Sequence, residues 1–99
     1  MLSKAKIKLI NQLAQKKYRQ QTGLFIAEGH KTVGDMMEYF TPEYLYYTSD
    51  YKGNTVANES SEVTYDELKK ISRLETPQNV LAVFKMPVFE NVSINSDEL

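Results

Sequence analysis

A continuous apolar run, Val-Leu-Ala-Val-Phe at residues 80–84, limits the possible folds of this chain more than any other feature. The run lacks the polar alternation of a half-exposed strand and is typical of a strand buried on both faces of its sheet. Such a sheet needs packed layers on both sides. We therefore expect helices on both faces of a small sheet.

A second strand is predicted at residues 24–27, Leu-Phe-Ile-Ala, because this short apolar run stands between Gly23 and Gly29. A helical pattern follows directly, with apolar residues spaced by three and four positions from Val33 to Phe40. This order directs the backbone amides of the helix start past the carboxyl end of the strand, which is a place suited to a phosphate.

The remaining segments continue the alternation of helices and strands. Ser3 suits the N-cap of one helix over residues 4–18, which contain no Gly or Pro. The aromatic stretch 44–48 predicts a strand, whose tyrosines we expect to pack against helices rather than to stack on bases. Residues 49–61 are predicted as a loop with one short helical turn, and residues 62–64 as a short extended piece.

Thr64 and Glu67 have the spacing of a capping box for a helix that runs to Arg73. Its core-facing residues are predicted to be Leu68, Ile71 and Leu74. The sequence thus predicts an α/β protein, a small three-layer α/β/α sandwich with a mixed or partly parallel sheet. We expect one domain over residues 1–87, and a polar, acidic linker over 88–99 that leads toward a catalytic domain absent from this chain.

The composition favours an ordinary globular protein. No apolar run approaches the roughly 20 residues that cross a bilayer, no secretory signal is recognised, and the chain contains no cysteine. We therefore expect a cytoplasmic protein without a membrane partner.

The net charge of −1 hides a strong asymmetry along the chain. Residues 1–31 contain seven Lys or Arg and one acid, whereas the other 68 contain five basic and twelve acidic residues. On the first helix a basic and amide-rich stripe is predicted, made of Lys4, Lys8, Asn11, Gln12, Gln15 and Arg19. An unpaired cationic stripe favours contact with phosphates, and a merely solubilising helix surface is the alternative.

The sequence shows no pattern of an enzyme active site. It contains no glycine-rich nucleotide motif, no P-loop, no metal-spaced cluster and no serine with a suitable histidine. His30, the only histidine, is placed to donate to a phosphate or to RNA, or else serves only as a cap. We therefore assign no catalytic residue, metal site or cofactor to this chain.

Three motifs resemble one known family. Lys17-Tyr18-Arg19, the stretch 23–29 (Gly-Leu-Phe-Ile-Ala-Glu-Gly) and Glu75-Thr76-Pro77-Gln78 are similar to the amino-terminal substrate-binding domain of SpoU/TrmH-type RNA 2′-O-ribose methyltransferases. The resemblance implies a fold like that of ribosomal protein L30e. It also implies a following SPOUT catalytic domain that binds S-adenosylmethionine and forms a homodimer.

The resemblance also implies where RNA would bind. L30e-like proteins hold RNA with the loop after the first strand and the loop before the last strand, which are residues 28–32 and 76–79 here. The motif of the kink-turn binders is absent, which argues against kink-turn recognition. Arg19 and Glu28 flank the first strand, and a simple ion pair between them is the alternative for these two residues.

We therefore expect the RNA-recognition domain of an S-adenosylmethionine-dependent methyltransferase that acts on structured rRNA, with tRNA as the alternative. The expected RNA-binding residues are Lys4, Lys8, Lys16, Lys17, Arg19, Gly29, His30, Lys31, Gln78 and Asn79. Two alternatives stay open, a stand-alone L30e-like RNA-binding protein and a protein-docking domain with little RNA contact.

Overall fold

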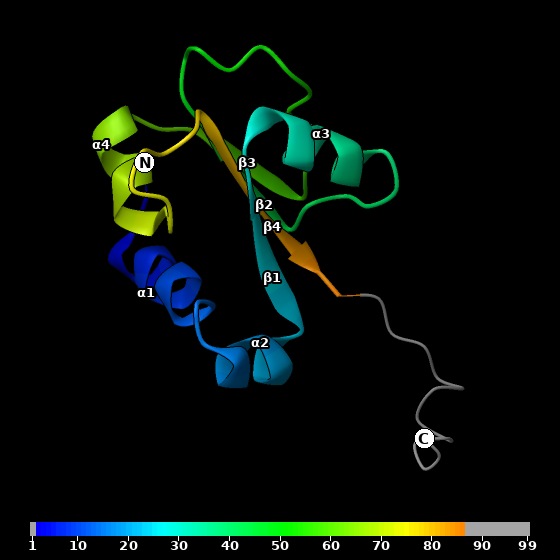
Figure 1. Cartoon of the computed structure of the whole chain (residues 1–99), viewed down its shortest axis with the longest axis vertical. Helices are drawn as coiled ribbons and strands as arrows, with labels where there is room; N and C mark the ends of the chain where they lie inside the picture. Colours follow the sequence, from blue (N-terminus) through cyan, green and yellow to red (C-terminus); the bar gives the residue numbers. More distant parts are fainter. Residues whose placement is uncertain (1, 87–99) are drawn as a thin grey trace.

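The fold was analysed in a computed structural model that describes residues 2–86 of the chain (Figure 1). Helices and strands alternate along most of this part. In chain order the elements are α1 (Lys4–Gln12), α2 (Lys16–Thr22), β1 (Leu24–Glu28), α3 (His30–Met37), β2 (Tyr44–Tyr47), β3 (Glu59–Glu62), α4 (Tyr65–Ile71) and β4 (Val80–Lys85). The linker predicted at residues 88–99 lies outside the described residues, so the predicted domain boundary stays a prediction.

The four strands form one mixed sheet in the order β1-β4-β2-β3. β4 is antiparallel to both of its neighbours, whereas β2 and β3 are parallel. The first five residues of β4 are all buried, which confirms that this apolar run is covered on both faces. The predicted mixed sheet is therefore confirmed.

Helices cover both faces of the sheet and make it a three-layer sandwich (Figure 1). Leu81 and Val83 of β4 pack in a core cluster with Ile10 of α1 and Leu68 and Ile71 of α4. On the opposite face of the sheet, Val33 of α3 packs in a second cluster with three residues of β4, which are Val80, Ala82 and Phe84. The predicted α/β/α arrangement is confirmed.

The predicted single helix over residues 4–18 is wrong, because the chain turns between α1 and α2. Three amide hydrogen bonds reach back three residues at this turn, beginning with Leu13 N–H to the Ile10 carbonyl (3.0 Å). The Leu13 side chain is buried in the core, and Arg19 of α2 donates to the carbonyl oxygens of Leu13 and Ala14. The turn thus follows from tertiary contacts that no local sequence signal encodes.

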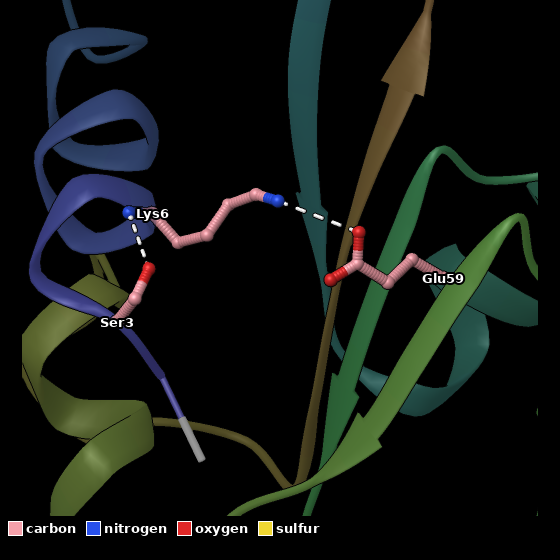
Figure 2. A network of polar contacts seen from close by, with 3 residues as sticks. All are labelled: Ser3, Lys6 and Glu59. Carbon is pink, nitrogen blue, oxygen red and sulfur yellow. Dashed lines mark hydrogen bonds and ion pairs between the residues drawn. The ribbon is translucent and has the colours of Figure 1, made fainter.

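α1 is also fixed at its beginning and along its side (Figure 2). Ser3 Oγ accepts from the Lys6 amide at 3.1 Å, which confirms the predicted N-cap. The Lys6 ammonium lies 3.4 Å from the Glu59 carboxylate on β3 and 4.0 Å from the centre of the Tyr44 ring on β2. Lys6, for which the sequence predicted no role, therefore connects α1 to the sheet.

The segment between β2 and β4 differs from the prediction in three places. Residues 59–62 form the edge strand β3, although residues 49–61 were expected to be a loop with a helical turn and 62–64 the extended piece. α4 ends at Ile71 because Ser72 adopts an extended conformation, and Leu74 is 44% exposed instead of facing the core.

Other local predictions are confirmed. The capping box of Thr64 and Glu67 is present at the start of α4, and Leu68 and Ile71 are buried. Tyr46 of β2 is buried against the helices as expected. No helix within residues 2–86 has the length and apolar character needed to cross a membrane.

Candidate nucleic-acid interface

The turn between β1 and α3 is built on Gly29. Its φ of +100° and ψ of 146° lie in a region that side chains other than glycine rarely adopt. Its amide donates to the Val80 carbonyl (3.1 Å), and its carbonyl accepts from Val33 N–H (2.9 Å) at the start of α3. No side chain in the described part of the chain caps α3. The first amides of this helix therefore face outward at the end of the sheet.

The loop before β4 lies directly beside this turn. In the antiparallel pair, Glu28 at the end of β1 stands opposite Leu81 near the start of β4. Gln78 reaches Gly29 so closely that a Cβ on the glycine would lie 3.6 Å from Gln78 Cγ. The structure thus brings together the two loops that were expected to hold RNA, 28–32 and 76–79.

A third loop, which follows β2, lies beside these two; the sequence predicted a loop there but no role for it in the site. Thr48 Oγ1 donates to Asn79 Oδ1 at 3.0 Å, and Thr48 N–H donates to the Asn79 carbonyl at 3.0 Å. Tyr51 packs edge-to-face on His30, with ring centres 5.5 Å apart. The side-chain oxygen of Asn79 is thus engaged within the protein, and its amide nitrogen is the group placed to donate to a ligand.

His30 and Lys31 stand on the exposed first turn of α3. The Lys31 ammonium lies 3.2 Å from the Asp35 carboxylate, and the two side chains are 89% and 67% exposed. Exposed pairs of this spacing contribute only about 0.3–0.5 kcal/mol, so Lys31 can exchange Asp35 for a phosphate at little cost. Burial raises the pKa of Tyr51, whose hydroxyl donates to the Asn54 carbonyl.

The basic residues of α1 and α2 form a separate group. α1 lies across the sheet from α3, and α2 lies at the beginning of β1 (Figure 1). Lys4, Lys8, Lys16 and Lys17 are exposed. β1 lies between α2 and Gly29, and its five residues span roughly 13 Å at about 3.3 Å per residue.

Arg19 and Glu28 both have structural partners, and they do not pair with each other. The Arg19 guanidinium lies 2.9 and 3.0 Å from the carbonyl oxygens of Leu13 and Ala14. Glu28 accepts from Ser72 Oγ (2.5 Å) and from the Arg73 amide (2.8 Å). Beside Glu28 lies a hollow of about 350 Å³ that the sequence did not predict; it is lined by Ile26, Glu28, Arg73 and Leu74.

The described residues offer no metal centre, since residues 2–86 contain no group of three or more His, Asp or Glu side chains arranged to hold an ion. What the site offers instead is outward backbone amides, a lysine, a histidine and side-chain amides around the end of the sheet. Such groups bind phosphates and base edges and carry out no bond chemistry by themselves.

Comparisons with known proteins agree on one family. A family model described as MRM3-like substrate binding domain matches residues 4–82. A structure described as an RNA methyltransferase of the TrmH family from Porphyromonas gingivalis is 33% identical with a TM-score of 0.77, over 89% of this chain and 37% of that one. No curated protein matches the chain.

Two further structures are similar. An rRNA methyltransferase from Sinorhizobium meliloti is 28% identical with a TM-score of 0.67, over 90% of this chain and 36% of that one. The SpoU methyltransferase AviRb from Streptomyces viridochromogenes, in complex with AdoMet, has a TM-score of 0.68 over 87% of this chain and 37% of that one. At 21% identity this last likeness shows the fold alone. The chain thus spans a little over a third of these proteins.

Proposed function

Because the chain belongs to the family of MRM3-like substrate-binding domains, we propose that it holds the RNA substrate of a SpoU/TrmH-type 2′-O-ribose methyltransferase. The family match over residues 4–82 is the observation that carries this proposal. The motifs at residues 17–19, 23–29 and 75–78 predicted the same family, and that prediction is confirmed.

The proposed role of this chain is to bind and orient RNA. Outward amides at the start of α3 and the ammonium of Lys31 suit a phosphate, and the side chains of Gln78 and Asn79 offer amide groups to base edges or 2′-hydroxyls. The fixed turn at Gly29 holds these groups in place before RNA arrives, which lowers the entropy lost on binding.

The whole protein is proposed to act on rRNA in the cytoplasm, as a homodimer with a SPOUT catalytic domain. S-adenosylmethionine supplies the methyl group when it is bound there. We place the cofactor in that catalytic domain and assign no cofactor contact to residues 2–86. The chain described here contributes binding and orientation of RNA only.

A titration of the chain with a structured rRNA hairpin, followed through backbone amide shifts, tests the proposal. We expect shifts at residues 28–32 and 76–79 that weaken from low to physiological salt, as phosphate contacts do. The matched pair of variants is Lys31→Gln, expected to weaken binding, and Lys69→Gln on α4, expected to have little effect. If RNA leaves these amides unmoved while an added catalytic domain shifts them, the surface docks protein and the proposal fails.

A further inference from the structure

β1 presents unpaired backbone groups along its free edge. It pairs with β4 on one side only, and no strand of residues 2–86 pairs with the other side. At its two ends, Met86 N–H donates to the Gly23 carbonyl and Gly29 N–H donates to the Val80 carbonyl. Hydrogen-bonded positions alternate in an antiparallel pair, so residues 25 and 27 face β4.

Leu24, Ile26 and Glu28 of β1 therefore point their backbone N–H and C=O groups away from the sheet. The outward amide of Leu24 is already bound to Thr22 Oγ1 at 3.2 Å. The backbone groups of Ile26 and Glu28 face outward in the same way.

A hollow lies beside the same two residues. Its wall combines the apolar side chains of Ile26 and Leu74 with the Glu28 carboxylate and the exposed side chain of Arg73, around a volume of about 350 Å³. Within the described residues the Arg73 guanidinium makes no ion pair. A cation, apolar walls and free backbone donors and acceptors are the groups that bind an unpaired nucleotide.

The far wall of the hollow is held in a fixed position. Glu28 accepts from Ser72 Oγ and from the Arg73 amide, while Ser72 Oγ in turn accepts from the Leu74 amide (3.0 Å). These bonds hold the backbone of Leu74 in place, although its side chain is exposed to solvent. The hollow is thus shaped without any ligand.

The edge of β1 also connects the two groups of basic residues. It runs from α2, which carries Lys16 and Lys17, to the start of α3, which carries Lys31 (Figure 1). Arg73 lines the hollow beside Ile26 and Glu28, and its amide donates to Glu28 at the end of β1. Cations at both ends of β1 and beside the hollow complement the charge of a strand of nucleic acid.

We propose that an unpaired nucleotide of the substrate RNA binds in this hollow, with its base between Ile26 and Leu74 and its phosphate on Arg73. The edge of the base pairs with the outward N–H and C=O of Ile26. A base with an exocyclic amino group also donates to the free lone pairs of the Glu28 carboxylate. This inference rests on the proposed function and extends it to the free edge of β1.

Short single-stranded oligocytidylate and oligouridylate are matched probes, because cytosine carries an amino group where uracil carries a carbonyl. We expect the chain to bind oligocytidylate more tightly, and the amides of Ile26, Glu28 and Leu74 to shift on binding. The change Arg73→Gln should weaken binding about tenfold, the usual effect of losing a charged hydrogen bond. Lys69→Gln on α4, which removes the same charge outside the hollow, should change affinity less than about twofold.

The outcomes separate this inference from the proposed function. If RNA moves residues 28–32 and 76–79 but leaves Ile26 and Leu74 unmoved, or if Arg73→Gln behaves like Lys69→Gln, the hollow is not a nucleotide site although the domain binds RNA. Equal affinity for the two oligonucleotides overturns the contact with Glu28. If neither oligonucleotide nor the rRNA hairpin binds, both proposals fail. If only added protein moves the Ile26 and Glu28 amides, the edge of β1 docks a polypeptide and the inference is overturned.

Discussion

Alanine substitutions at Gly29 and at Gly34 should change the stability of the domain in opposite directions. At Gly29 the φ of +100° forces any side chain into a strained backbone conformation, although the space around a new Cβ is sufficient. Such strain costs about 1–3 kcal/mol, and the stiffer unfolded chain returns about 0.4–1 kcal/mol. We expect Gly29→Ala to lose about 1–2 kcal/mol.

Gly34 is the matched control, five positions along the chain. It lies inside α3 (His30–Met37) with an ordinary φ, and a Cβ there would meet no atom within 4 Å. Glycine inside a helix is less stable than alanine by about 0.5–1 kcal/mol, so Gly34→Ala should stabilise the domain by that amount. The two variants should differ by about 1.5–3 kcal/mol.

Thermal and urea unfolding followed by circular dichroism measures this difference. For a domain of this size, 1 kcal/mol shifts Tm by about 4–8 °C, so the two midpoints should stand roughly 10–20 °C apart. A Gly29→Ala variant as stable as the wild type would contradict the described turn between β1 and α3. A destabilised Gly34→Ala variant would contradict the open space beside α3.

Three further changes test other parts of the structure. Glu28→Ala removes the acceptor of two hydrogen bonds and should cost about 2 kcal/mol in urea unfolding, whereas Glu62→Ala on the exposed edge strand should stay within about 0.5 kcal/mol. Burial raises the pKa of Tyr46 to about 12, so the folded state keeps its proton where the unfolded state loses it. Stability should fall between about pH 10 and pH 12, and Tyr46→Phe should remove part of that fall. Thr64→Ala should lower the free energy of unfolding by about 1 kcal/mol, because it removes the N-cap of α4. The hydrogen bond from the Thr64 amide holds the pKa of Glu67 below its usual range, so stability should also decline as acid protonates the Glu67 carboxyl.

The sequence predicted most accurately the features that depend on residues close together in the chain. The N-cap of Ser3 and the capping box at Thr64 are local patterns, and both are present. The turn after α1 was missed because its causes, the buried Leu13 and the guanidinium of Arg19, are tertiary. β3 was missed because it is polar and joins the sheet through backbone pairing with β2.

The candidate site was predicted in part for the same reason. The two loops around Gly29 and Gln78 were expected together from the family resemblance, and they meet because β1 and β4 are neighbours. The contributions of Thr48 and Tyr51 depend on the pairing of β2 with β4, which a sequence pattern does not specify. The aromatic stretch before Tyr51 was the one available signal. The hollow beside β1 was missed because Leu74 was assigned to the core.

Arg19 illustrates how the structure changes the design of a binding test. Its guanidinium holds the carbonyl oxygens at the end of α1, so an Arg19→Ala variant would confuse loss of stability with loss of RNA binding. Lys16 and Lys17 are exposed neighbours on the same helix. We expect them to contact phosphates, and they make no such contact with the end of α1. Lys16→Gln with Lys17→Gln is therefore the cleaner double variant.

The salt dependence of RNA affinity tests the central claim most directly. With about three phosphate contacts, the logarithm of the association constant for a single-stranded site should fall with the logarithm of salt concentration at a slope of roughly −2. The double variant at Lys16 and Lys17 should bind more weakly and lower the steepness of that slope. A domain that binds no RNA at low salt, or whose slope is flat and unchanged by the double variant, would contradict its role as the RNA-holding part of a methyltransferase.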